Sequence, residues 1–169
     1  DFDGTGDYVS IAQSFGALFN GSNDFEIECW ADFDISSNTG VIFHPRADHD
    51  IGIYQRISSG INFNFWDGSN NDVAVGSNPA ASTLFHIRST WDASGNMELF
   101  VDDATQGTPL TTGTPNTVTD DNLIGAQKTT PTNEFDGLID EMRIHNVLRS
   151  SSFRSAEYDN QNSPSTFAS

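Results

Sequence analysis

Four aspartates near the two ends of the chain have the chemistry of a site for a hard cation. Asp1 and Asp3 belong to the opening DFDGTGD, Asp34 follows the run FEIECWADF, and Asp140 lies within FDGLIDEMRIHNV. Carboxylate oxygens are the ligands that calcium prefers, and the neighbouring glycines let backbone carbonyls approach closely. The pattern predicts a metal site of Asp1, Asp3, Asp34 and Asp140, and the alternative is a set of solvated acidic turns.

Asp140 is the strongest of these candidates because of its position in the strand predicted from Phe135 to Val147. Three apolar residues share its parity, namely Leu138, Met142 and Ile144. Strict alternation therefore predicts that the Asp140 carboxylate points toward the core, where it is expensive unless a cation or several donors meet it. If the first and last strands lie side by side, Asp1 and Asp3 would share that cation.

A second group of residues has the chemistry of a saccharide surface, a flat aromatic ring beside amide donors and acceptors. Trp66 has the parity of Asn62 and Asn64 in a strand predicted from Ile61 to Trp66, which we expect to present these three side chains on one exposed face. Tyr54 is a further candidate for stacking on a sugar ring. The alternative is that Trp66 lies under a loop. The other two tryptophans fall in predicted core strands and are expected to be structural.

The segment HPRADHD, from His44 to Asp50, interrupts the strand pattern. Its two histidines, His44 and His49, together with Asp50 could bind a transition metal, but the spacing is not diagnostic. We favour a polar rim loop in which Arg46 and the histidines donate hydrogen bonds to sugar hydroxyls.

Composition narrows the range of partners. The 169 residues are enough for one domain with a hydrophobic core, and 13 phenylalanines predict that this core is rich in Phe. The formal charge of −17, with Lys128 as the only lysine, argues against nucleic acid and anionic membrane surfaces as partners. It favours cations, neutral glycans or a salty environment, such as that of a halophilic or marine secreted protein. Solubility alone is the alternative explanation.

Cys29 is the only cysteine and is expected to be a small core residue, so no disulfide within the chain is possible. The sequence contains no signal-peptide pattern and no apolar run that predicts membrane insertion. We expect a single domain over residues 1–169 with a linker-like tail at about 160–169, taken from a larger extracellular protein.

Roughly a dozen short apolar segments separated by turn residues predict an all-β fold, a two-sheet antiparallel β-sandwich. Ile51 to Ile57 and Ile61 to Trp66 are predicted to form a hairpin. The segment from Arg149 to Gln161 is the one plausible helix.

Four segments occur in a familiar order: FDGTGDYVSI, FEIECWADF, LFHIRSTWDASGNMELFVDD, and IGAQ followed by FDGLIDEMRIHNVLRS. Together they resemble the laminin-G-like, concanavalin A-like jelly-roll domains of secreted bacterial and archaeal multi-domain proteins, over nearly the whole chain. The resemblance implies two antiparallel sheets, a structural calcium ion near the paired termini, and carbohydrate binding on the concave face or on the rim loops.

The glycanases of this fold carry an acid-rich motif of the type Glu-x-Asp-x-x-Glu, which the run from Asp24 to Glu28 does not reproduce. Glu26 and Glu28 share a strand face, but we expect no catalysis. The function expected is a non-catalytic, lectin-like carbohydrate-binding module that is monomeric as an isolated domain and extracellular. The alternatives are a spacer or protein-contact module and, less favoured, a divergent glycan hydrolase or lyase.

Overall fold

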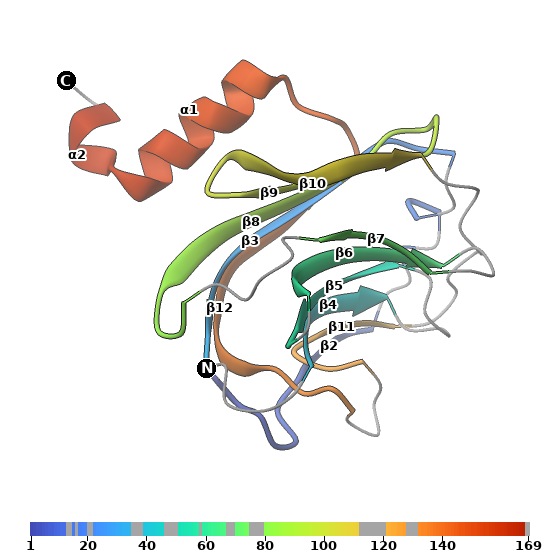
Figure 1. Ribbon diagram of the computed structural model, residues 1–169, viewed down its shortest axis with the longest axis vertical. Coiled ribbons are helices and arrows are strands. Elements are labelled where there is room, and N and C mark those ends of the chain that lie inside the picture. The colour runs from blue at the N-terminus through green and yellow to red at the C-terminus, as the bar shows by residue number, and fades with distance from the viewer. Residues whose placement is uncertain are drawn as a thin grey trace.

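The computed structural model describes residues 1–12, 15, 17–19, 22–34, 39–45, 51–57, 59–66, 70–74, 80–111, 121–127 and 132–167, with the side chains of all of these apart from 66, 70–74, 111, 166 and 167. Within these ranges two six-stranded antiparallel sheets face each other (Figure 1). The predicted all-β sandwich is therefore confirmed.

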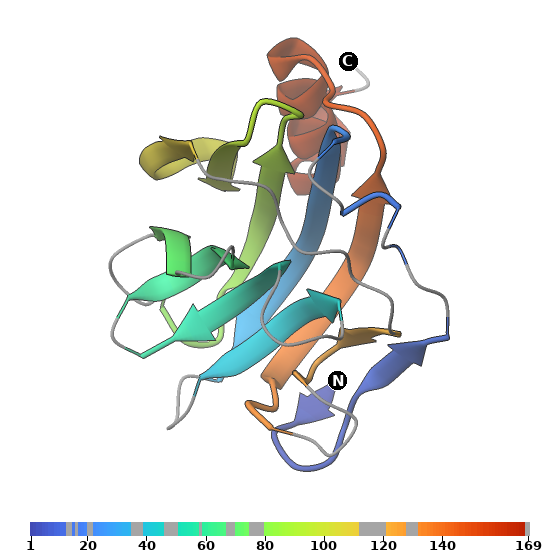
Figure 2. The ribbon, with the colours of Figure 1, turned by 90° about the vertical axis from the view of Figure 1, so that its right-hand side faces the viewer.

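The first sheet has the order β1 (Phe2–Asp3), β12 (Asp136–His145), β3 (Phe25–Phe33), β8 (Leu84–Trp91), β9 (Asn96–Val101) and β10 (Ala104–Thr111). The second sheet has the order β2 (Val9–Ile11), β11 (Asn122–Ile124), β4 (Gly40–Pro45), β5 (Ile51–Arg56), β6 (Gly60–Trp66) and β7 (Asn70–Ala74). Figure 2 shows the second sheet in front of the first, whose long strands run up toward the C-terminal helix.

Alternating side chains from both sheets fill the space between them. On β3 the residues that face the second sheet are Phe25, Ile27, Cys29, Ala31 and Phe33, all at most 1% exposed. Phenylalanines from the second sheet pack against them, as the composition predicts. Cys29 is buried, which raises the pKa of its thiol and makes it a core residue rather than a nucleophile.

The predicted neighbourhood of the first and last strands is also confirmed. In the pairing of β1 with β12, Phe2 lies opposite Gly137 and Asp3 lies opposite Asp136. Gly137 has a φ of 135°, and a Cβ there would lie 2.1 Å from the carbonyl oxygen of Asp32 on β3. Only glycine allows β12 to approach β3 so closely at this point.

The alternation predicted for the last strand is wrong, because β12 contains a bulge. Its register against β3 shifts between Asp140 and Arg143, and Glu141 has a φ of 52°. Residues that pack against the core change parity across the bulge, from Ile139 to Met142 and Ile144. Leu138 is 47% exposed and Asp140 is exposed, so the Asp140 carboxylate does not point into the core.

The predicted C-terminal helix exists as α1 (Ser151–Asn162), and α2 (Pro164–Phe167) follows it. Ser150 caps α1 by accepting a hydrogen bond from the Phe153 amide at 3.3 Å. Figure 1 shows α1 on the side of the first sheet that points away from the second sheet, which we call the outer face. Among the described residues, no helix has the length and apolar character needed to cross a membrane.

Candidate functional site

The outer face of the first sheet carries charged and aromatic side chains where the inner face carries apolar ones. Strand register places them in rows that run across β12, β3 and β8. Three consecutive rows contain Arg143, Glu28 and Arg88, then Asp140, Trp30 and His86, then Leu138, Asp32 and Leu84. The first row lies beneath α1, and the last is open.

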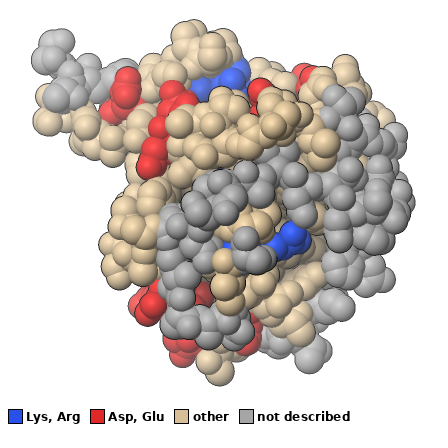
Figure 3. All heavy atoms as spheres, in the orientation of Figure 1, with Lys and Arg blue, Asp and Glu red and all other residues tan. Residues whose placement is uncertain are grey.

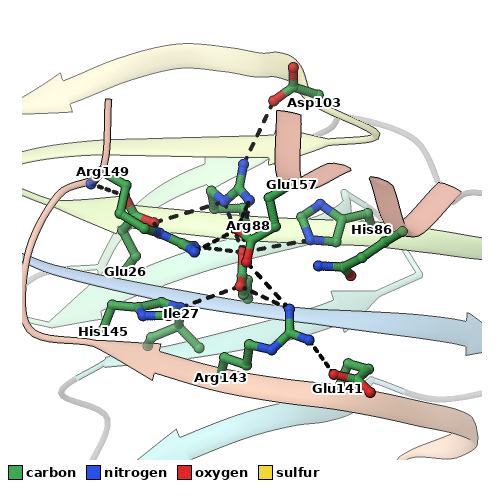
Figure 4. Close-up of polar contacts among 12 residues, drawn as sticks. Glu26, Ile27, His86, Arg88, Asp103, Glu141, Arg143, His145, Arg149 and Glu157 are labelled. Carbon is green, nitrogen blue, oxygen red and sulfur yellow. Dashed lines mark hydrogen bonds and ion pairs between the residues drawn. The ribbon is translucent and has the colours of Figure 1, made fainter. Parts of the chain in front are cut away.

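Two buried glutamates organise the covered part of this face (Figure 4). Arg88, which is 0% exposed, donates from Nε and Nη2 to Glu28 Oε2 at 3.1 and 2.8 Å. Arg149 donates from its backbone amide and Nε to the two carboxylate oxygens of Glu26 at 2.7 and 2.8 Å, and from Nη2 to Glu28 at 2.8 Å. The segment before α1 is thereby fastened to β3.

The helix adds a third carboxylate from above. Glu157 accepts from Arg149 Nη1 at 2.5 Å and from Arg88 Nη2 at 3.2 Å, and it lies 3.5 Å from Arg143 Nη1. Figure 4 shows the side chains of Arg88, Arg143 and Arg149 converging from different elements. Arg88, Arg143 and Arg149 therefore form one group, which we call the arginine cluster.

The network sets the protonation of its members. Burial raises the pKa of Glu28, but the hydrogen bonds and charges of Arg88 and Arg149 outweigh it and hold that pKa at about 2. Burial, together with the charge of Arg88, lowers the pKa of His86 to about 4 despite the nearby Glu28. Near neutral pH, Glu28 is therefore ionised and His86 is neutral. Glu26 and Glu28 are fully engaged with arginines, an arrangement that suits ion pairing and not proton transfer.

A groove opens on the same face where α1 ends. Its volume is about 430 Å³, and it is lined by Trp30, Leu84, Asp140, Glu141, Arg143, Gln161 and Asn162. These residues come from β3, β8, β12 and α1, so the groove exists only when the C-terminal helix lies on the sheet. We refer to it as the groove and take it as the candidate functional site.

The bulge in β12 supplies the charged wall of the groove. It places the consecutive residues Asp140 and Glu141 on one side of the strand, and both are exposed. The Glu141 amide donates to Asp140 Oδ1 at 2.8 Å, and the Glu141 carboxylate pairs with Arg143. A bulge often re-aims a side chain in this way.

The opposite wall depends on contacts between Trp30 and the helix. Tyr158 stacks on Trp30 with ring centroids 6.1 Å apart, and Trp30 Nε1 donates to Gln161 Oε1 at 2.5 Å. Trp30 is only 9% exposed, so its edge forms part of the floor, while Leu84 is 50% exposed. The sequence predicts a purely structural role for Trp30 in a core strand, and it does not predict the groove. One signal in the sequence could have indicated this site. Three of the six arginines, Arg143, Arg149 and Arg154, lie in or next to the last strand and the predicted helix.

The residues predicted for sugar binding on the second sheet are brought together but are not exposed. Tyr54 lies opposite Asn62, Gly52 lies opposite Asn64, and the rings of His44 and Tyr54 are 5.8 Å apart.

The exposed fractions of Tyr54, Asn62, Asn64 and His44 are only 1–3%. The predicted exposed face is therefore wrong for Asn62 and Asn64, and the two other candidates, Tyr54 and His44, are buried as well. Local contacts explain part of this burial. Asn62 bonds to Ser59 and to the Gly60 carbonyl within the hairpin, at 2.9 and 2.6 Å, and the Tyr54 ring covers Gly52. The Trp66 side chain, Arg46 and His49 lie outside the described residues, as does Asp50.

The structure separates Asp140 from the other predicted metal ligands, since Asp3 and Asp34 both lie beside Asp136. Asp3 Oδ1 accepts the Thr5 amide at 2.8 Å, and the Asp34 amide donates to the Asp136 carbonyl at 3.0 Å. Asp140 lies four residues beyond Asp136 along β12, roughly 13 Å away at the usual rise of a strand. Asp1 and Asp140 are both exposed. Within the described ranges, no three His, Cys, Asp or Glu side chains are placed to hold a metal ion.

Similar solved structures share the fold at low sequence identity. A carbohydrate-binding module of a sialidase from Ruminococcus gnavus, bound to α2,3-sialyllactose, has a TM-score of 0.68 and 13% identity, over 90% of this chain and 98% of that one. Domain 4 of the arabinanase AbnA from Geobacillus stearothermophilus, in complex with arabinotriose, has a TM-score of 0.66 and 16% identity, over 86% and 70%. Domains LG4-5 of the mouse laminin α1 chain have a TM-score of 0.65 and 16% identity, over 87% and 40%.

No curated protein matches the chain by sequence. A family model does match, and it covers residues 3–152, which begin at the second residue of β1, include the other eleven strands of the two sheets and end as α1 begins. The resemblance carried by the four sequence segments is thereby confirmed. The chain belongs to the concanavalin A-like lectin/glucanases superfamily of the laminin G type.

Proposed function

We propose that the protein is a non-catalytic, lectin-like saccharide-binding module of a secreted or surface protein, and that the groove at the end of α1 is its binding site. The observation that carries the proposal is the composition of the groove. An aromatic edge and a half-exposed leucine, Trp30 and Leu84, lie beside two amide side chains, Gln161 and Asn162. A sugar ring presents apolar C–H faces and hydroxyls that match such a combination.

The exposed carboxylates add hydrogen-bond acceptors to this site. Asp140 accepts one backbone amide at a single oxygen, which leaves acceptor capacity for hydroxyl groups of a ligand. The groove volume of about 430 Å³ is within the ordinary range for small-ligand sites of roughly 300–1,000 Å³. It suits one or two sugar residues of a longer glycan.

The state of the buried glutamates supports a non-catalytic role. A glycosidase needs one carboxyl group that can donate a proton and a second that can act as base or nucleophile. Glu28 is held ionised by two arginines, and both oxygens of Glu26 accept from Arg149. The saccharides bound to the Ruminococcus gnavus and Geobacillus stearothermophilus domains support the choice of ligand class.

A glycan array followed by titration of the best ligand tests this function. We expect Leu84→Ala and Asn162→Ala to weaken binding by about 1–2 kcal/mol each, as for side chains near the centre of a small site. Leu138→Ala is the matched control, because Leu138 is similarly exposed at 47%, lies across Asp32 from Leu84, and does not line the groove.

Trp66→Ala separates this site from the one predicted on the second sheet. If the groove is the site, this variant binds as the wild type does. Loss of binding in Trp66→Ala with normal binding in Leu84→Ala would move the site to the second sheet. No binding to any glycan would overturn the proposed function.

A protein-contact module is the second candidate, and the edge of the second sheet favours it. The edge strand β2 carries Val9, which is 49% exposed, and Tyr8 beside it is 37% exposed. An exposed apolar edge can pair with a strand of a partner. Pull-down of a partner by the wild type and not by Val9→Lys, with no glycan bound, would favour this alternative.

The proposal includes a structural calcium ion, which rests on the family resemblance and on the pairing of β1 with β12. We expect calcium to raise the melting temperature by several degrees relative to EDTA, because an ion bound only by the folded state stabilises it. Asp3→Asn should remove this response, whereas Asp140→Asn should keep it because that carboxylate lies far along β12. Identical melting of the wild type in calcium and in EDTA would remove calcium from the proposal.

A further inference from the structure

The helix α1 is held on the outer face with little apolar burial. None of its residues is buried, and Phe153 is 54% exposed. Its contacts with the sheet are polar or involve ring faces. Ser155 donates to Asp103, Arg154 lies over the Phe100 ring, and Gln161 accepts from Trp30. Apart from the ion pairs of Glu157, such contacts are exchanged for water at modest cost, so a ligand that replaces those ion pairs can displace α1 more readily than a strand of the sandwich.

The Glu157 carboxylate lies in a binding site formed by the three guanidinium groups of the arginine cluster. Each member of the arginine cluster offers it one nitrogen, namely Arg88 Nη2, Arg143 Nη1 and Arg149 Nη1, at 3.2, 3.5 and 2.5 Å. These arginines come from β8, β12 and the segment before α1, and they are three of the six in a chain with a net charge of −17. Cations that are scarce in the sequence are therefore concentrated at one point.

The orientation of Arg88 and Arg149 in the arginine cluster is set by the β3 glutamates, without a contribution from α1. Glu28 fixes Arg88 and one nitrogen of Arg149, and Glu26 holds Arg149 through two further bonds. Arg149 Nη1, which makes no bond to these two glutamates, is left for Glu157, and Arg88 Nη2 reaches Glu157 and Glu28 at the same time (Figure 4). A set of guanidinium groups held in this way is preorganised for a carboxylate, because the cost of ordering the long side chains has already been met by the fold.

We propose that the arginine cluster is a binding site for the carboxylate of a uronate-bearing saccharide, and that Glu157 occupies this site until such a ligand displaces α1. The inference rests on the proposed saccharide-binding function and extends it. Arg143 belongs both to the cluster and to the lining of the groove. Displacement of α1 removes Gln161 and Asn162 from the groove and uncovers Trp30 and His86, so an open surface then extends along the outer face from Asp140 to Arg88.

The tethered Glu157 sets the affinity of this site. A side chain on the same chain competes at a high effective concentration, so the wild type binds an acidic saccharide weakly. The surface of the molecule also repels anions, and acidic side chains are visible at several places in Figure 3. At an ionic strength of about 0.15 M this repulsion is screened beyond roughly 8 Å, whereas contacts with the cluster are not.

Calorimetric titration with tetragalacturonate at physiological salt tests the inference, and its fully methyl-esterified form serves as the uncharged ligand with the same backbone. We expect Glu157→Gln to bind tetragalacturonate at least about tenfold more tightly than the wild type. Binding of the methyl ester should be the same in both proteins. Asp159→Asn is the matched control, because it removes one negative charge from an exposed position of the same helix, and it should bind as the wild type does.

A second variant keeps the test decisive if Glu157→Gln does not fold. Tyr158→Ala removes the stacking of α1 on Trp30 and leaves the charges and the groove residues in place, and it should also gain affinity for tetragalacturonate. Amide exchange in α1 should then increase on adding this ligand.

Two results overturn the inference. One is an unchanged affinity for tetragalacturonate in both helix variants, and the other is an equal gain in Asp159→Asn. If the glycan array identifies a ligand while these variants gain nothing, the proposed function stands and this inference fails. If no variant binds any saccharide, both fail.

Discussion

Arg88 Nη2 donates to Glu28 at 2.8 Å and to Glu157 at 3.2 Å, so one nitrogen joins the sheet to the C-terminal helix. Arg88 is 0% exposed although it is the longest charged side chain on its strand. A buried guanidinium is tolerated only when carboxylates surround it. The outer face of the first sheet is thus built on charge compensation, in contrast to the phenylalanine core on the inner face.

Glu28→Gln should lower the free energy of unfolding by about 3–5 kcal/mol, because it leaves buried arginines without their main counter-charge. Urea unfolding measures the change. Adding Arg88→Met to Glu28→Gln should recover part of the loss, since the uncompensated charge is then removed. Glu98→Gln, on the same face and outside the network, is the control and should change stability by less than about 0.5 kcal/mol. Additive effects of Glu28→Gln and Arg88→Met would contradict the coupling.

Stability should fall as the pH is lowered, in two overlapping ranges. The folded protein lowers the pKa of His86 to about 4 from an ordinary value of 6.5, so between these values the unfolded chain binds the proton more readily. Glu28 has a pKa of about 2 against an ordinary 4.5 and extends the decline to lower pH. Urea unfolding from pH 8 to pH 3 should show a plateau above about pH 7. In His86→Gln the decline should begin near pH 5, and an unchanged profile would exclude His86 as its cause.

Much of the fold follows from local sequence patterns. The alternation of Phe25, Ile27 and Phe33 with polar residues predicts β3 and its buried face, and the matching segments at the two ends predict the pairing of β1 with β12. Alternation failed at Asp140 because the bulge at Glu141, which has a positive φ, reverses the parity of the strand. A glycine at this position would have indicated a bulge in the sequence, whereas a glutamate does not.

The candidate site was less predictable for a different reason. The groove and the arginine cluster combine residues from β3, β8, β12 and α1 that are far apart in the chain. Where a helix lies on a sheet is decided by tertiary contacts such as that between Glu157 of α1 and Arg88 of β8, and no local period encodes them. Exposure on the second sheet was misjudged because alternation indicates which face a side chain is on, and does not indicate what covers that face.

The bulge in β12 should tolerate glycine and resist β-branched residues. Glu141 has a φ of 52°, a conformation that costs a β-branched side chain about 1–2 kcal/mol and glycine little. We expect Glu141→Val to lower the free energy of unfolding by about that amount relative to Glu141→Gln, which keeps the shape of the side chain and removes its charge. The free energy of unfolding of Glu141→Gly should lie within about 0.5 kcal/mol of that of Glu141→Gln. Glycine relieves the backbone strain at positive φ, and this gain offsets the greater conformational freedom of the unfolded chain. Equal stabilities for the valine and glutamine variants would show that the bulge relaxes.

Added salt should stabilise the protein, because most of the acidic side chains are on its surface while two of its few arginines are buried in ion pairs. The net charge is −17, and Arg88 and Arg149 already form ion pairs with Glu28 under α1. They therefore do not offset the acidic side chains on the surface, which repel one another. Salt screens that exposed repulsion and affects the buried pairs much less. We expect the melting temperature in metal-free buffer to rise continuously from low to molar sodium chloride. The rise should be smaller for a variant in which three exposed acids outside the network, Asp1, Asp7 and Asp159, are replaced by asparagine. A melting temperature that is flat or falls with salt would show that surface repulsion does not limit stability, and it would remove the halophilic interpretation of the composition.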